Sequence, residues 1–326
     1  MTATLGRLSL VRRFAAWSTP GTLEPSGIGF GGQLRRGATP AVSSPRLLKL
    51  LRGLVVAYVP LTAALAVAAV LDPRTLMGEP VWTKPLKFSV SIGLNGAALL
   101  WLARRSPASP FVREATLLSA LGLAVEQTLI MLQAARGVRS HFNTDTPFDG
   151  AVFAGMGASL AGGVGIAAVA LAVVFALRPP QDQVLTRVAR SGVGLLLLGF
   201  AVGAVMLALG RHSVGTVDGD PGLPLVGWST IAGDLRPAHF VGLHGLQALI
   251  IASYLLRHAP VPTRLAVVRT LTWGIAGLVT ALTGQALAGA PVLSGSSGLV
   301  AVVAAVATGA GALSARRPTP TASVAR

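Results

Sequence analysis

The sequence GAVFAGMGASLAGGVGIAAVALAVVFAL (residues 150–177) contains no charged side chain. A helix of this length, at about 1.5 Å per residue, is longer than the hydrocarbon core of a bilayer, which is about 30 Å thick. Backbone N–H and C=O groups in lipid must be hydrogen-bonded within their own segment. The stretch therefore predicts a transmembrane α-helix and not a strand.

Seven other apolar runs have a similar character. The predicted spans are 47–71, 85–103, 114–135, 150–177, 190–209, 238–256, 265–287 and 297–314. We therefore expect an all-α integral membrane protein, with a transmembrane domain of about eight helices at 46–315. Residues 1–45 and 316–326 are rich in Ser, Thr, Pro and Arg, without a spanning apolar run, and are interpreted as disordered cytoplasmic tails.

The composition supports this class. Charged residues make up 12% of the chain, against about 25% in soluble domains, and the mean hydropathy is +0.67. The net charge of +16 does not indicate nucleic-acid binding, because the arginines gather in short segments between apolar runs. The chain has no cysteine, which excludes disulfides, Cys-ligated zinc, iron–sulfur clusters and thiol catalysis.

The distribution of Lys and Arg predicts the orientation. With the N-terminus inside, 20 of the 27 basic residues fall in cytoplasmic segments and seven fall on the other side. Positive charge accumulates on the cytoplasmic side of membrane proteins. We expect both termini in the cytoplasm, and the cytoplasmic (inner) membrane of a bacterium as the location.

Small residues recur at four-residue spacing within several spans. Gly155, Ser159 and Gly163 form one such stripe, and Gly199 and Gly203 form another. Such stripes let helix backbones approach closely in lipid. They predict helix packing and not a nucleotide-binding loop.

Polar residues concentrate in three segments on the predicted outer side, at 72–91, 133–150 and 210–247. These segments and the adjoining helix ends hold seven of the eleven acids and four of the five histidines. Polar groups also continue into the spans, where Lys87, Ser91 and Asn95 recur at i, i+4 and i+8 on one helix face. A polar site near the outer face is therefore expected.

Glu126 is the acid nearest the middle of a predicted span. Such a residue costs about 2.5–3.5 kcal/mol on insertion scales, so it is expected to face the bundle interior. Lys87, Asn95 or His244 are its expected partners. Asp234 is expected to be an N-cap, with Pro237 in the first turn of the following helix.

From these residues we predict two sets of site residues. The predicted catalytic residues are Glu126, His244, His239, Asp234 and His141. The predicted substrate-binding residues are Lys87, Arg136, Arg236, Gln133, Gln247, Asn95, Trp82 and Trp228. Burial makes Glu126 a proton donor, and His244 or His239 the base, while Lys87, Arg136 and Arg236 are candidates to hold an anionic head group.

Three motifs resemble those of a group of uncharacterised bacterial multi-pass membrane proteins. They are WTKPLKF at 82–88, RSHFN at 139–143 and GDLRPAHFVGLH at 233–244. The resemblance covers roughly residues 47–256. It implies a shared site and brings no particular reaction with it.

The leading hypothesis is a membrane-embedded enzyme that performs acid–base chemistry on a lipophilic or amphiphilic small molecule. One version is isoprenoid cyclisation or isomerisation, as in small integral-membrane terpene cyclases, which the chain resembles in size and in buried acids. The alternatives are a proton-coupled transporter, a haem- or metal-binding redox protein, and a non-catalytic regulatory subunit. No cofactor is favoured and no metal site is predicted, because His239 and His244 lie about 140° apart around a helix.

Overall fold

The computed structural model describes residues 45–105, 110–177, 179–294 and 297–316. About three quarters of this part of the chain is helical. The helices are α2 (Pro45–Leu71), α3 (Thr83–Arg105), α4 (Pro110–Ala135), α5 (Pro147–Ala158), the π-helix η1 (Ser159–Gly165), α6 (Ile166–Leu177), α7 (Gln183–Leu209), α8 (Arg236–Leu243), α9 (Gly245–Leu255), α10 (Val261–Leu287) and α11 (Ser297–Arg316).

Six helical segments of the described chain are long and apolar enough to cross a membrane, and there are seven if the bent pair α8–α9 counts as one span. The protein is thus an α-helical, multi-pass membrane protein. The expected tails at 1–45 and 316–326 lie outside the described residues, apart from Pro45 and Arg316 at their edges.

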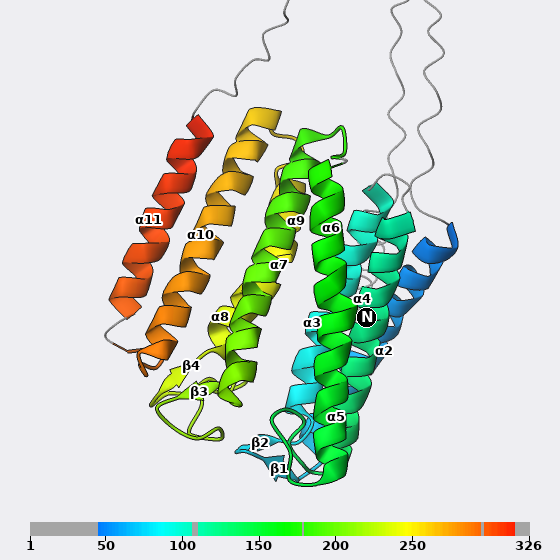
Figure 1. Ribbon diagram of the computed structural model, residues 1–326, viewed down its shortest axis with the longest axis vertical. Coiled ribbons are helices and arrows are strands. Elements are labelled where there is room, and N and C mark those ends of the chain that lie inside the picture. Colours follow the sequence, from blue (N-terminus) through cyan, green and yellow to red (C-terminus); the bar gives the residue numbers. More distant parts are fainter. Residues whose placement is uncertain (1–44, 106–109, 178, 295–296, 317–326) are drawn as a thin grey trace, which may run out of the picture. The chain divides into compact units, whose positions relative to one another are not determined.

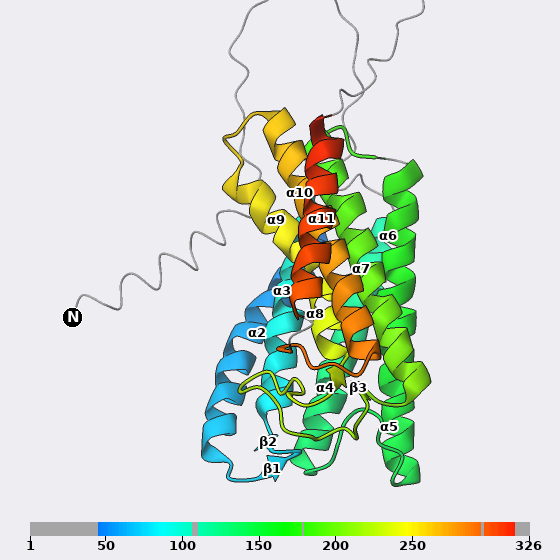
Figure 2. The ribbon, with the colours of Figure 1, turned by 90° about the vertical axis from the view of Figure 1, so that its left-hand side faces the viewer.

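The helices form two groups that are contiguous in sequence (Figures 1 and 2). Helices α2, α3 and α4 pack together with η1 and α6, whereas α7 packs with α8, α9 and α10, and α10 with α11. The groups meet chiefly through α6 against α7 and α3 against α9. We call this second contact the α3–α9 seam.

Glycines allow the closest helix contacts within each group. A Cβ on Gly163 of η1 would lie 2.8 Å from the carbonyl oxygen of Leu118, and one on Gly199 of α7 would lie 2.6 Å from the backbone nitrogen of Leu243. A side chain at either position would push the helices apart. The predicted packing role of these two glycines is confirmed.

One end of the bundle carries two short hairpins (Figure 1). Strand β1 (Thr75–Leu76) pairs with β2 (Glu79–Pro80), and β3 (Ser213–Val214) pairs with β4 (Gly233–Asp234), both antiparallel. We call this end the hairpin end. It holds the starts of α3, α5 and α8 and the end of α4, so it gathers the three polar segments noted in the sequence.

The predicted span at 238–256 is not one straight helix. Helix α8 ends at Leu243, α9 begins at Gly245, and the two are bent by 44°. The prediction that Asp234 caps this helix is also wrong. The N-cap is Leu235, and Asp234 lies in β4, where its Oδ1 accepts a hydrogen bond from the Arg236 backbone.

Candidate functional site

The centre of the candidate site is a contact between a buried acid and a histidine. Glu126 of α4 is 1% exposed, and its Oε1 lies 3.2 Å from Nε2 of His141 in the loop after α4. The distance is that of an ion pair, and within the described residues neither carboxylate oxygen accepts a well-directed hydrogen bond. Glu126 is therefore an incompletely satisfied buried acid.

Lys84 of α3 lies on the other side of the imidazole ring. Its Nζ is 3.2 Å from His141 Nδ1, and the Ser140 hydroxyl is 3.1 Å from the same atom. An ammonium group only donates, so Nδ1 accepts and a neutral ring carries its proton on Nε2, toward Glu126. Burial, followed by the charge of Lys84, holds the pKa of His141 below its usual value although Glu126 opposes this. The ring is therefore neutral at pH 7.

This row of three groups can move a proton. If Lys84 gives a proton to Nδ1 while Nε2 gives its own proton to Glu126, the carboxylate becomes a carboxylic acid and the amine becomes neutral. The surroundings are apolar, since the rings of Phe88 and Phe153 lie 5.8 and 6.2 Å from the ring of His141. A largely buried, apolar site with a proton donor and a proton acceptor is suited to general acid–base chemistry.

The residues expected to face Glu126 have other partners, so this part of the prediction is wrong. Nε2 of His244 lies 3.1 Å from the Ser91 hydroxyl, and the amides of Asn95 and Gln247 lie 2.8 Å apart. Both pairs bridge the α3–α9 seam. The predicted polar face of α3 is real, but it meets α9 and not α4.

Lys87 also turns away from Glu126. Its Nζ lies 2.9 Å from Oε2 of Glu79 and donates to the carbonyl of Val226 at 3.2 Å. Arg236 of α8 pairs with Asp234 at 2.6 Å and donates to the carbonyl of Gly227. Two cationic side chains from different helices thus converge on one turn of the loop at 221–229.

His239 of α8 contacts the backbone of α7. Its Nδ1 lies 2.8 Å from the carbonyl oxygen of Gly199, and its ring fills the space beside Gly203. His239 is also within electrostatic range of His141 and His244. The histidines predicted from sequence therefore lie around one region, although only His141 contacts Glu126.

Arg136 and Gln133 form a separate, saturated cluster. Both side chains donate to Oδ1 of Asp149, which is buried and also accepts from Thr146. Thr146 is the N-cap of α5, so the cluster fastens the end of α4 to the start of α5. This arrangement supports a structural role for Arg136 and Gln133 and not the predicted substrate contact.

The two tryptophans stabilise loops at the hairpin end. Trp82 donates to Oδ2 of Asp72 at 2.8 Å. The ring of Trp228 lies 6.4 Å from that of Phe240, which in turn lies 4.4 Å from the ring of His244. The aromatic row links the 221–229 loop to the break between α8 and α9.

A further polar cluster fixes the loop before α8. Nδ1 of His212 lies 3.4 Å from Asp218, and burial together with the charge of Arg236 lowers the pKa of His212 to about 4. Burial acts to raise the pKa of Asp234, but hydrogen bonds and the charge of Arg236 outweigh it, and the net shift is downward. His212 is thus neutral and Asp234 ionised at neutral pH.

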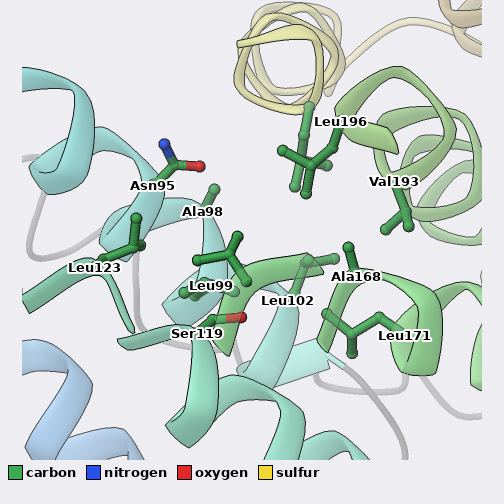
Figure 3. A pocket seen from close by; sticks show the side chains of 12 residues that line it. Asn95, Ala98, Leu99, Leu102, Ser119, Leu123, Ala168, Leu171, Val193 and Leu196 are labelled. Carbon is green, nitrogen blue, oxygen red and sulfur yellow. The ribbon is translucent and has the colours of Figure 1, made fainter. Parts of the chain in front are cut away.

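Figure 3 shows a cavity beside the seam, lined by Asn95, Ser119 and apolar side chains of α3, α4, α6, α7 and α9. Its volume is about 20 Å³, room for about one water molecule. Ligand pockets usually measure about 300–1,000 Å³. As it stands, this cavity is too small for a lipophilic substrate.

Within the ranges that the structure describes, no three His, Asp or Glu side chains are placed to hold a metal ion. Comparison of the chain with protein-family models, curated proteins and solved structures gave no match.

Sequence reasoning missed two members of these clusters. Neither Lys84, which lies in the WTKPLKF motif and among the outer basic residues, nor Asp149, an acid of the 133–150 segment, is among the predicted site residues. The spacing of Lys84 and Lys87, three residues apart on one helix, was a signal for the first. The Thr146-Pro147 pair, which predicts a helix start, was a signal that Asp149 lies in a first turn.

Proposed function

We propose that the protein is a membrane-embedded enzyme that performs acid–base chemistry on a lipophilic or amphiphilic small molecule, such as isoprenoid isomerisation or cyclisation. The observation that carries the proposal is the position of His141 between Lys84 and Glu126. Glu126 protonates a carbon–carbon double bond, and a basic group nearby removes a proton from an adjacent carbon. Such a reaction requires no electron transfer.

The location of the site fits a substrate that partitions into lipid. Glu126 lies within a spanning helix and His141 in the loop that follows it. We further propose eight spans in the cytoplasmic membrane, with both termini inside, which is supported by the excess of Lys and Arg in the segments at the other end of the bundle from the hairpins.

Solvent deuterium tests the reaction class. Membranes containing the protein are incubated in D₂O with a lipid extract, and lipids are compared by mass spectrometry. We expect a product that carries deuterium at carbon, formed by the wild type and not by Glu126→Gln. Turnover that places no deuterium at carbon, or that survives Glu126→Gln, would refute the proposal.

A proton-coupled transporter is the second candidate, and the broken span α8–α9 favours it. Transporters often bind their substrates where a helix is interrupted near the middle of the membrane. Here the break falls at His244, beside the α3–α9 seam. Liposomes containing the protein and an entrapped pH indicator separate the two candidates, because a carrier alone couples proton flux to uptake of an unmodified compound.

A further inference from the structure

Resting on the proposed function, we infer that Lys84, Lys87 and Arg236 form a binding site for an oxyanion head group. The substrate is then an anionic amphiphile, with a phosphate or carboxylate at one end and an apolar chain at the other. The three cations are hereafter called the cationic cluster.

The first argument is geometric convergence. Nζ of Lys87 donates to the carbonyl of Val226 at 3.2 Å, and Nη2 of Arg236 donates to the carbonyl of Gly227 at 2.5 Å. These carbonyls belong to consecutive residues, so a helix of each group supplies a cation to the same turn. Lys84 lies three residues before Lys87 and hence on the same side of α3.

The second argument is the state of Lys84. Lys87 has Glu79 as its ion-pair partner and Arg236 has Asp234. In the described part of the chain, no carboxylate oxygen lies within 4 Å of Lys84 Nζ. This nitrogen contacts the neutral ring of His141 instead. One cation of the cluster therefore lacks a direct counter-charge, and a ligand anion supplies it.

The third argument is the kind of group that now contacts the cluster. Two carbonyl oxygens of the 221–229 loop and the carboxylate of Glu79 accept the hydrogen bonds of Lys87 and Arg236. The loop is seated tightly, because a Cβ on Gly227 would lie within 2.4 Å of Oε1 of Glu79. The oxygens of a phosphate or carboxylate accept hydrogen bonds from Lys and Arg as these carbonyl oxygens do. The head group therefore takes the place of the loop carbonyls when the loop moves.

The charges around Glu126 couple this site to the proton on the acid. His141 contacts Glu126 directly. Lys84 interacts electrostatically with Glu126, Lys87, Asp218 and Arg236, and His141 does so with His239 of α8. When Glu126 takes its proton from solution and Lys84 keeps its own, the negative charge that opposes an anion beside Lys84 is removed. Anion binding and proton binding therefore favour each other, and an anionic substrate loads the acid that acts on it.

The test measures binding without turnover. Wild-type protein in neutral detergent is titrated with dodecyl phosphate, with inorganic phosphate, and with dodecyl maltoside as an uncharged chain of equal length, and Trp fluorescence reports binding. The variants are Lys84→Gln, Lys87→Gln and Glu126→Gln. Arg139→Gln is the matched control, since Arg139 is a cation at the same end that pairs with the exposed Asp145.

We expect dodecyl phosphate to bind the wild type and Arg139→Gln equally, and Lys84→Gln about tenfold more weakly or worse, because a hydrogen bond to a charged group is lost. Lys87→Gln should show a similar loss, which covers the case of a misfolded Lys84→Gln. Glu126→Gln should bind more tightly than the wild type. Equal weakening in Arg139→Gln and Lys84→Gln overturns the site, and inorganic phosphate binding as tightly as dodecyl phosphate overturns the amphiphile.

The binding site and the proposed reaction can each be refuted without refuting the other. If Glu126→Gln abolishes turnover while Lys84→Gln leaves dodecyl phosphate binding unchanged, the cationic cluster is refuted and the acid–base enzyme stands. If dodecyl phosphate binds as expected but no deuterated product forms, the head-group site stands and the reaction is refuted.

Discussion

His141 Nε2 lies 3.2 Å from Glu126 Oε1 because the chain reverses sharply where α4 ends. Gly137 has φ +72°, its N–H donates to the Ala134 carbonyl, and the N–H of Val138 donates to the Gln133 carbonyl. These two bonds form a Schellman motif, which satisfies carbonyls at the helix end and requires a left-handed residue. The turn brings the next segment back along α4 and places the imidazole against the buried acid.

Replacing Glu126 by Gln should lower turnover at least ~10²-fold, because general acid–base catalysis contributes about 10²–10⁴-fold. Shape and burial are nearly unchanged, so the protein should still insert and purify normally. Turnover is measured as deuterium incorporation in membranes. Glu114→Gln on the same helix is the control, since Glu114 is half exposed and pairs with its neighbour Arg113. Equal activities of Glu114→Gln and Glu126→Gln would contradict the prediction.

Gly199→Ala should destabilise the protein by about 1–3 kcal/mol, the usual cost of overpacking. The new methyl group would lie 2.6 Å from the Leu243 backbone, so α7 and α8 must separate. Gly194→Ala is a matched control on α7, because nothing lies within 4 Å of a Cβ there. Thermal unfolding in neutral detergent should show a lower midpoint only for the first variant. A lower midpoint for both would show that the loss does not come from the close contact at Gly199, because Ala favours a helix more than Gly does.

Acidification should destabilise the hairpin end. The pKa of His212 is about 4 in the folded protein against an ordinary value of 6.5, so the folded state disfavours the proton. The stabilisation is complete above pH 6.5 and is lost as the pH falls toward 4. His141 contributes with the same sign below its ordinary pKa of 6.5, since its pKa is lowered, whereas Asp234 adds its own loss only below its ordinary pKa of 3.8.

The thermal unfolding midpoint of the wild type should therefore decrease as the pH is lowered from 7 to 4.5. The midpoint of His212→Gln should decrease less. A fluorescence melting series across this range measures both. Parallel curves for the two proteins would show that protonation of His212 does not cause the loss of stability.

The hydrogen bond between Asn95 and Gln247 should be detectable by comparing single and double variants. Asn95→Leu leaves a buried amide without its partner, which costs about 1–3 kcal/mol. The double variant Asn95→Leu/Gln247→Met replaces both polar groups with apolar ones and should recover most of that loss. The unfolding midpoints of the two single variants and the double variant test this. Additive losses in the double variant would mean that the two amides do not interact.

The helices and their buried polar faces were predictable, because apolar length and i, i+4 spacing are local properties. The burial of Glu126 and the polar face formed by Ser91 and Asn95 follow from such rules. The partner of Glu126 was not predictable in this way. His141 reaches it through a turn that depends on Gly137, and His244 is carried away from it by the break between α8 and α9.

The roles of the basic residues show the same limit. Charge counts treat Lys84, Lys87 and Arg136 alike, but each has a different set of neighbours from distant segments. Arg136 meets Asp149, Lys87 meets Glu79, and Lys84 meets a histidine. Which cation keeps a free charge is decided by tertiary contacts that no local pattern encodes.

The chain passes between the two helix groups once, between Leu177 and Gln183, since α2–α6 form one group and α7–α11 the other. Each group is an uninterrupted stretch of polypeptide with its own internal packing. A split gene that encodes the two stretches separately should therefore yield fragments that insert independently and associate in the bilayer. The polar pairs Ser91–His244 and Asn95–Gln247 would then act as the recognition elements that bring the fragments into register.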